Sequence, residues 1–205
     1  MATTASPYGL IPVKNADGSN YVGARNAYPI NASSYDFNIF FGTVVILKDG
    51  YVQIAGTTGE DNSSNNFAGA ANAGALGVFV GCEYINSEGQ LVFNNYFPAN
   101  TANATAYVVD DPNVTFQAQA DAAVTQAMLG QNTSLANAQT KTTGSTTTGK
   151  SNLALDGTPI DDKTEAFKII GFSDRPGSTV GDTYTDLLVK FNPEFHLFSV
   201  GSVTS

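Results

Sequence analysis

The chain has 205 residues, 18 of them acidic and 9 basic, with a net charge of −9, one histidine, one cysteine and no tryptophan. Charged residues make up 13% of the chain, against roughly 25% in ordinary soluble domains. Catalytic and metal sites are built mainly from such side chains, so the composition favours a structural or binding protein over an enzyme. The acidic balance argues against binding of nucleic acid or anionic membranes, which needs clustered Lys and Arg.

The first predicted element is an extended N-terminal arm, residues 1–13. Pro7 and Pro12 bias their neighbours toward extended backbone and exclude a helix. The segment has neither a basic region nor an apolar run, so we do not expect a cleaved signal peptide. We expect the arm to dock on a partner protein through its apolar and proline side chains, which are Pro7, Tyr8, Leu10, Ile11 and Pro12. The alternative is that the arm packs on its own domain as a first edge strand.

A β-hairpin is predicted after the arm. Residues 37–47 and 51–55 are aromatic and β-branched runs on either side of Asp49 and Gly50. An Asp-Gly pair between two such runs is the strongest short-range hairpin signal. Residues 56–75, which follow, are mostly small and polar and predict a long, flexible surface loop.

Two more hairpins are predicted in the middle of the chain. One joins residues 76–85 to residues 90–97 through an Asn-Ser-Glu-Gly turn. The other joins residues 104–110 to residues 115–120 through an Asp-Pro-Asn turn. The last of these runs alternates apolar and polar residues with the period of a half-buried strand.

One short helix is predicted next. Asp121 can cap residues 122–129, and Gly130 supplies a C-terminal stop. Residues 136–151 then form a stretch rich in Thr, Gly and Ser, which predicts a second flexible loop.

The C-terminal part returns to strands. The candidates are residues 152–155, 166–173, 185–191 and 195–200. Many short strands with frequent turn residues are typical of antiparallel barrels and sandwiches. The predicted fold is therefore mainly β: an antiparallel β-barrel or sandwich with one short helix and long loops, in a single domain of residues 14–205 that follows the arm.

A phosphate-binding pattern occurs inside the second loop. Residues 144–151 read GSTTTGKS and match the P-loop, in which backbone amides and the lysine cradle phosphates. A working P-loop needs a buried strand before the first glycine and a helix after the lysine. Residues 138–143 are polar instead, and the DGTP sequence at 156–159 breaks any helix. We therefore expect no nucleotide site.

The remaining reactive side chains form no recognisable site. The pairs Asp110–Asp111 and Asp161–Asp162 lack the spacing of a calcium cage. His196 has no second histidine with which to build a metal site, and it cannot support a catalytic triad by itself. Cys82 lies in an apolar run and is expected to be buried. The sequence thus predicts no catalytic, cofactor-binding or metal-ligating residue.

Five segments carry a family resemblance. They are residues 6–13 (SPYGLIPV), 38–55, 76–98, 106–129 and 180–190 (VGDTYTDLLVK). They are spread along the chain from residue 6 to residue 190, and they resemble the decoration, or cement, proteins of tailed-bacteriophage heads.

This resemblance implies a structural virion protein rather than an enzyme. Such proteins are β-rich and often trimeric, and they stabilise the expanded head from outside by clamping neighbouring major capsid subunits. The expected partner is the major capsid protein, without nucleic acid or membrane, and without a cofactor. The expected location is the outer capsid surface of the virion, after synthesis in the bacterial cytoplasm. The apolar C-terminal end suits a homotrimer, with Phe195, His196 and Phe198 as candidate contacts.

Two other functions fit the same sequence. The chain could be a head fibre or a receptor- or carbohydrate-binding module on the virion surface. Less favoured is a glycan-degrading enzyme that uses paired carboxylates. The position of the protein on the particle would distinguish a head fibre or receptor-binding module from a decoration protein. Turnover of polysaccharide would distinguish a glycan-degrading enzyme from both.

Overall fold

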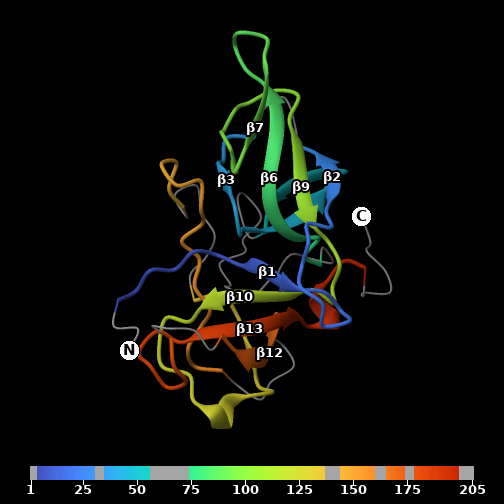
Figure 1. The fold of residues 1–205 in the computed structure, drawn as a ribbon. Coiled ribbons are helices and arrows are strands. Elements are labelled where there is room, and N and C mark those ends of the chain that lie inside the picture. Colours follow the sequence, from blue (N-terminus) through green and yellow to red (C-terminus); the bar gives the residue numbers. More distant parts are fainter. Residues whose placement is uncertain are drawn as a thin grey trace.

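The structure is a computed structural model that describes residues 4–30, 35–55, 74–136, 144–159, 165–173 and 178–198 (Figure 1). Its strands are β1 (Ile11–Lys14), β2 (Asn26–Pro29), β3 (Ile39–Phe40), β4 (Val44–Lys48), β5 (Tyr51–Ile54), β6 (Gly77–Ile85), β7 (Leu91–Asn94), β8 (Tyr96–Phe97), β9 (Thr105–Val109), β10 (Thr115–Gln119), β11 (Asn132–Thr133), β12 (Phe167–Phe172) and β13 (Asp186–Phe191). The 3-10 turns are η2 (Gln126–Met128) and η3 (Pro193–Phe195). The mainly β prediction is confirmed.

The strands build two antiparallel sheets and one short ladder. Sheet A has the order β1-β10-β13-β12-β11, sheet B has the order β2-β9-β6-β4-β5 with β7 added along β6, and β3 pairs with β8. In Figure 1, sheet A lies across the lower part of the molecule, and β6 and β9 of sheet B rise from it. A single bridge between Ile30 and Val52 brings the two ends of sheet B together. No ladder closes the sheet in the described part of the chain, so the fold is a sandwich rather than a barrel.

Sheet B is buried on both faces where it meets sheet A. Along β4, Val44 and Ile46 face a core shared with sheet A, whereas Val45 faces a second core that includes Ile39 and Phe97 of the β3–β8 ladder. A strand with both faces covered needs a continuous apolar run rather than alternation. This requirement explains the unbroken Val-Val-Ile-Leu sequence of β4.

The upper ends of β6 and β9 extend beyond the cover of sheet A. Val78 and Val109 are paired and lie in the shared core. Glu83 and Tyr107, farther along the same face, are only half-buried. Figure 1 shows this end of sheet B, with the β6–β7 hairpin, projecting away from sheet A. One face of sheet B is therefore core at its lower end and surface at its upper end.

The first two predicted hairpins are confirmed. β4 and β5 pair across Asp49 and Gly50, whose φ angles are 51° and 81°, as a two-residue type I′ turn requires. β6 and β7 pair around the turn at residues 86–89. The end of the second predicted run leaves this hairpin, because Tyr96–Phe97 form β8 and pair with β3. The run over residues 37–47 is interrupted at Gly42, where φ is 86°, so its first part becomes the separate strand β3.

The third predicted hairpin is wrong. β9 pairs with β2 and β6 in sheet B, whereas β10 pairs with β1 and β13 in sheet A. The turn at residues 111–113 is present, since the Val114 amide donates to the Asp111 carbonyl at 3.2 Å. It carries the chain from one sheet to the other. Val109 and Val114 on either side of this turn both lie in the shared core, and their burial there favours a corner of the sandwich over a hairpin.

The predicted helix over residues 122–129 is wrong, because only the short turn η2 forms there. Asp121 does not cap it, and its carboxylate accepts a hydrogen bond from the Gly157 amide at 2.7 Å. Val124 is fully buried, and its amide donates to the Thr185 hydroxyl at 3.3 Å. Tertiary contacts therefore override a weak local helix preference.

Two of the four predicted C-terminal strands are confirmed as β12 and β13. Residues 152–155 form no ladder and make only single bridges through Leu155. The run over 195–200 begins inside η3, and its last two residues lie outside the described part of the chain. The first predicted flexible loop also lies largely outside it, at residues 56–73. Of the second, residues 137–143 lie outside it, whereas residues 144–151 are described.

The N-terminal arm packs on its own domain, as the edge-strand alternative has it. β1 is an edge strand of sheet A and pairs with β10. Leu10 is fully buried in the shared core, and its amide donates to the Gly42 carbonyl at 3.0 Å. The Tyr8 hydroxyl donates to the Asp186 carboxylate at 2.7 Å and accepts from the Gln117 side chain at 2.8 Å. The described part of the arm is thus a component of the sandwich.

Candidate functional site

Three exposed apolar side chains gather on the projecting β6–β7 hairpin. Ile85, Leu91 and Phe93 are 47%, 55% and 65% exposed. Ile85 and Leu91 are paired directly across the two strands, and Phe93 lies two residues beyond Leu91, so all three point to one face. We call them the hairpin patch. Isolated apolar residues on a surface are ordinary, but a contiguous group of them is typical of an interaction surface.

The hairpin patch was not found from the sequence. Residues 91–93 read Leu-Val-Phe, so β7 is apolar on both faces. Val92 pairs with Tyr84, which packs against the second core, and this side of the hairpin is the inner one. The local sequence does not reveal which face of such a strand is covered, because that depends on how far sheet A extends.

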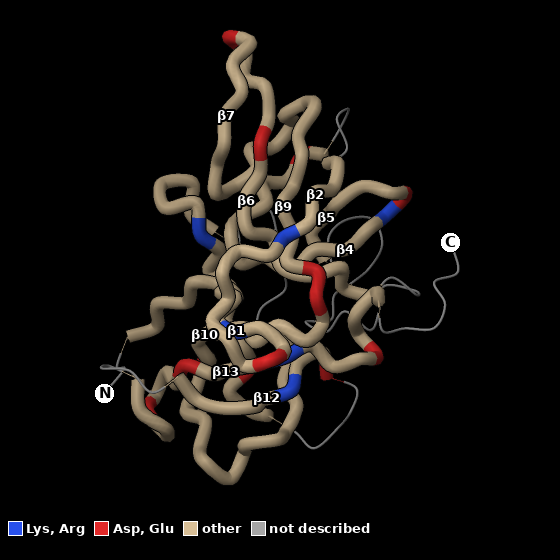
Figure 2. Tube along the Cα trace, turned by 45° about the vertical axis from the view of Figure 1, so that its right-hand side comes forward, with Lys and Arg blue, Asp and Glu red and all other residues tan. Residues whose placement is uncertain are grey.

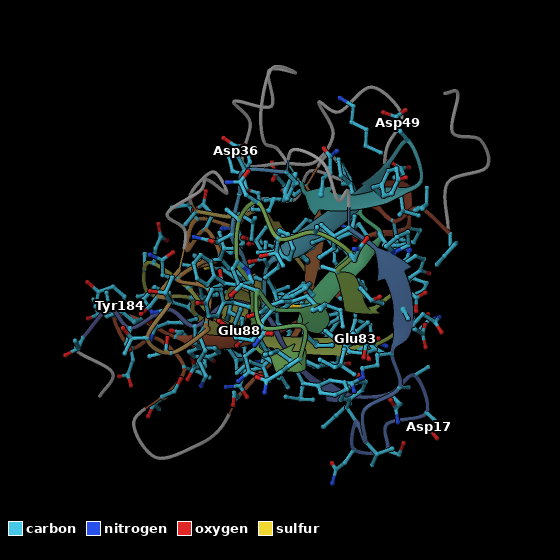
Figure 3. All side chains as sticks on the ribbon, turned by 90° about the horizontal axis from the view of Figure 1, so that it is seen from above. Asp17, Asp36, Asp49, Glu83, Glu88 and Tyr184 are labelled. Carbon is cyan, nitrogen blue, oxygen red and sulfur yellow. The ribbon has the colours of Figure 1, made fainter. Side chains whose placement is uncertain are left out.

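Charged and polar side chains border the hairpin patch on the side of β9. Glu83 is the cross-strand partner of Phe93 and accepts a hydrogen bond from the Tyr107 hydroxyl at 2.7 Å, which raises the pKa of Tyr107. The Arg25 guanidinium lies 4.1 Å from the centre of the Tyr107 ring. Figure 2 shows acidic positions along β6 and at the hairpin tip, and Figure 3 places Glu83 and Glu88 in this region. The patch is an apolar surface with a largely acidic border.

The backbone of β7 adds a second feature to this surface. Among the strands that the structure describes, β7 pairs only with β6. The free edge of a strand can take an extended segment of a partner protein through backbone hydrogen bonds, while alternate side chains fill pockets. The hairpin therefore offers both an apolar face and an edge for β-strand addition.

The five arm residues predicted to contact a partner are not equally accessible. Leu10 is fully buried in the core, and Pro7, Tyr8, Ile11 and Pro12 are half-buried. We correct the expectation for Leu10, because a side chain in the shared core cannot reach a partner while β1 stays in sheet A. The other four lie at the surface of the sandwich rather than on a free extension.

The C-terminal candidates for oligomer contacts are also divided by burial. Phe198 is 59% exposed. Phe195 is 6% exposed and belongs to the shared core. His196 is fully buried against the rings of Phe191 and Phe198, and burial lowers the pKa of His196 to about 4. Phe195 and His196 are thus core residues, because backbone hydrogen bonds to Ala75 hold this segment against the domain, and only Phe198 remains available.

Residues 144–151 do not form a P-loop. Gly144 and Ser151 are bridged, and the amides of Ser145, Gly149 and Ser151 donate to backbone carbonyls at distances of 2.8–3.0 Å. These amides are not free to cradle a phosphate. No helix follows in the described residues up to 159.

The described carboxylates build no metal cage. No group of three or more His, Cys, Asp or Glu side chains in the described ranges could hold a metal ion. Asp110 accepts hydrogen bonds from the Asn26 and Tyr28 side chains, and Asp161–Asp162 lies outside the described residues. Cys82 is buried, and burial raises its pKa to about 12, so it is not a reactive thiolate. Among the described surfaces, the hairpin patch is therefore the strongest candidate site.

Comparison of the chain with protein-family models, with curated proteins and with solved structures finds no match. Within the residues that the structure describes, no helix has the length and apolar character needed to cross a membrane. The candidate site is consequently inferred from the geometry of the structure.

Proposed function

We propose that the protein is a decoration protein that binds the outer surface of a phage head and stabilises the lattice by clamping neighbouring major capsid subunits. The observation that carries this proposal is the hairpin patch, an exposed apolar face at the projecting end of a sandwich that buries most other large apolar side chains. The resemblance of five sequence segments to decoration proteins supports the choice of partner. The low content of reactive side chains supports binding rather than catalysis.

The proposed contact is apolar at its centre. Burial of Ile85, Leu91 and Phe93 contributes on the order of 5 kcal/mol, before the costs of association. The border of Glu83 and Glu88 and the net charge of −9 favour a capsid surface whose apolar pocket is flanked by basic side chains. The edge of β7 can add backbone hydrogen bonds to an extended capsid segment.

We also propose a homotrimer on the capsid. Three copies that dock together bind far more tightly than one, because the first contact raises the effective concentration of the other two. With Phe195 and His196 buried, Phe198 is the remaining C-terminal candidate for the contact between copies.

Binding to capsids tests the proposal directly. Heads prepared without the protein are mixed with the wild type or with the double variant Leu91→Ser and Phe93→Ser, and occupancy is measured by sedimentation. We expect at least about tenfold weaker binding of the double variant, because it removes two of the three apolar side chains. Circular dichroism should show an unchanged fold, since both side chains are exposed.

Val22→Ser is the matched control, since Val22 is 88% exposed and lies outside the hairpin. It should bind like the wild type. Wild-type occupancy by the double variant would show that the hairpin patch is not the capsid contact. No binding of the wild-type protein to heads would refute the decoration function itself.

A further inference from the structure

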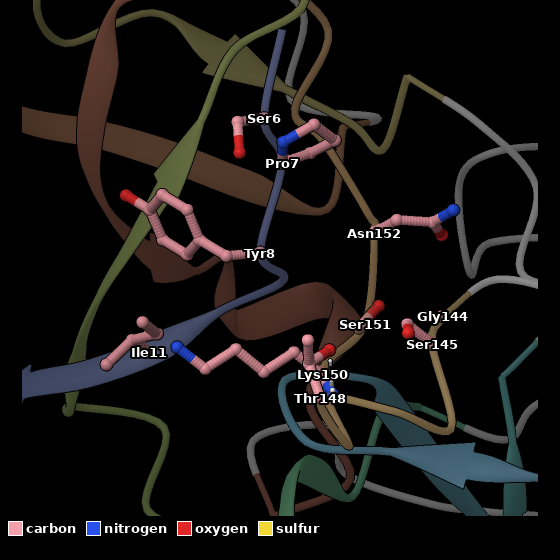
Figure 4. A pocket seen from close by; sticks show the side chains of 10 residues that line it. All are labelled: Ser6, Pro7, Tyr8, Ile11, Gly144, Ser145, Thr148, Lys150, Ser151 and Asn152. Atoms are coloured by element: carbon pink, nitrogen blue, oxygen red, sulfur yellow. Dashed lines mark hydrogen bonds between the residues drawn. The ribbon is translucent and has the colours of Figure 1, made fainter.

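A pocket of about 450 Å³ opens between the N-terminal arm and the 144–152 segment (Figure 4). Its lining combines one aromatic ring (Tyr8), one amine (Lys150), one amide (Asn152) and several hydroxyls, including those of Ser145 and Thr148. None of its lining residues is acidic. This set of side chains differs from the apolar hairpin patch and calls for a polar ligand.

Both walls of the pocket are held in place by hydrogen bonds. On the arm, the Tyr8 hydroxyl is bonded to the buried Asp186 carboxylate and to the Gln117 side chain. On the opposite wall, Ser151 is buried, and its amide donates to the Phe41 carbonyl at 2.9 Å. A ligand therefore meets a largely preformed site, which reduces the entropy lost on binding.

The amine of Lys150 supplies an uncompensated positive charge. Lys150 is exposed, and its amine makes no ion pair or hydrogen bond with any residue that the structure describes. In Figure 4 its side chain extends toward Ile11, with the nitrogen on the side of the arm. In a protein with a net charge of −9, a lone cation among hydroxyls favours a ligand that is anionic and rich in hydroxyl groups.

The hydroxyls are suited to bonding such a ligand. The Thr148 oxygen accepts the Lys150 amide at 3.3 Å, which leaves its hydroxyl proton to donate. Asn152 is exposed, and an amide side chain both donates and accepts. The backbone amides of Ser145, Gly149 and Ser151, in contrast, already donate within the protein, which disfavours a phosphate or nucleotide.

We propose that this pocket binds a saccharide that carries a carboxylate, such as a uronic acid residue of a polysaccharide. Lys150 contacts the carboxylate, Thr148 and Asn152 bond to sugar hydroxyls, and the Tyr8 ring packs on the apolar face of the sugar. This binding does not depend on docking to a capsid.

Titration of ¹⁵N-labelled protein with oligogalacturonate tests the proposal, with a neutral galactan oligomer of the same length for comparison. We expect shifts at the amides that line the pocket and tighter binding of the acidic oligomer. Lys150→Gln should weaken acidic binding about fivefold and remove the preference over the neutral oligomer. Asn152→Ala should weaken both oligomers. Lys168→Gln is the matched control, because it removes the same charge from an exposed position on β12 and should bind like the wild type.

Three results would overturn the proposal. The first is the absence of pocket shifts with the acidic oligomer. The second is equal binding by wild type and Lys150→Gln, with both spectra showing a folded protein. The third is that acetate or inorganic phosphate produces the same Lys150-dependent shifts at the same concentration, which would indicate an anion site without selection for a sugar.

Discussion

Single glycines decide how closely the N-terminal arm approaches the rest of the sandwich. Gly9 and Gly42 have φ angles of 75° and 86°. A Cβ at Gly9 would lie 2.8 Å from the Gly42 carbonyl oxygen, and a Cβ at Gly42 would lie 2.9 Å from the Leu10 nitrogen. Both positions therefore need glycine for the backbone conformation and for the close contact.

We expect Gly42→Ala to destabilise the protein by about 3 kcal/mol, from left-handed strain together with a backbone clash. Gly18→Ala is the matched control, because Gly18 has a φ of 83° but a Cβ added there would meet no atom within 4 Å, and it should lose about 1 kcal/mol. Urea unfolding measures both. Equal losses in the two variants would show that the close approach contributes nothing.

His196 is a second residue of this kind, because its burial should make the stability of the protein depend on pH. It is fully buried, its Nε2 atom has no hydrogen-bond partner among the described residues, and its Nδ1 accepts the Phe198 amide at 3.3 Å. Burial lowers the pKa to about 4, although the nearby Asp110 and Asp111 charges oppose the shift. The native state therefore favours the neutral ring.

This lowered pKa predicts a loss of stability in mild acid. Between pH 6.5 and about pH 4 the unfolded chain binds a proton that the native state does not, so the free energy of unfolding falls as the pH falls. The stability that comes from the neutral His196 ring is fully present above pH 6.5 and is lost below about pH 4. The free energy of unfolding differs by about 3 kcal/mol between these limits. Urea unfolding of the wild type and of His196→Leu at several pH values measures it, because titrating carboxylates are common to both. Parallel curves for the two proteins would contradict the prediction.

Among the elements, the N-terminal arm is held to the sandwich by β1, by one buried side chain just before β1 and by several hydrogen bonds. Leu10 lies in the shared core just before β1. The Ser6 amide donates to the Gln119 side chain at 2.8 Å, and the Gly9 amide donates to the Leu153 carbonyl at 3.2 Å. This element resembles an ordinary edge strand more than a docking arm.

We expect Leu10→Ala to destabilise the protein by about 2–5 kcal/mol, because it removes a fully buried side chain and leaves a cavity. Leu129→Ala is the control, since Leu129 is 43% exposed and its truncation should cost less than about 0.5 kcal/mol. Thermal unfolding distinguishes the two. Near-identical melting temperatures for Leu10→Ala and the wild type would return Leu10 to the candidates for partner contact.

The assembly of the whole molecule is a further prediction. We expect light scattering to give the mass of a trimer, and we expect Phe198→Ser to shift it toward the monomer, because Phe198 is the C-terminal candidate that remains exposed. Circular dichroism provides the check on folding. A monomer in solution together with single, separated copies on a decorated head would contradict the homotrimer.

Local signals in the sequence determined much of the fold. The Asp49–Gly50 pair identified the β4–β5 hairpin, because only a few residues accept positive φ at both turn positions. Alternating and apolar runs located β6, β10, β12 and β13, since strand formation follows side-chain pattern over a few residues. Composition favours a binding protein over an enzyme, and that expectation stays a prediction.

Only the tertiary structure decided how these elements combine. In the structure, β9 belongs to sheet B and β10 to sheet A. A short turn forms after Asp121 instead of the predicted helix, and Leu10 and His196 are buried. The tertiary structure also exposed Leu91 and Phe93 while covering Val92, because sheet A ends below the β6–β7 hairpin. Burial between distant segments determines which strands pair and which faces of a sheet are covered. Where a strand is apolar on both faces, its local sequence does not show which face will pack against another layer.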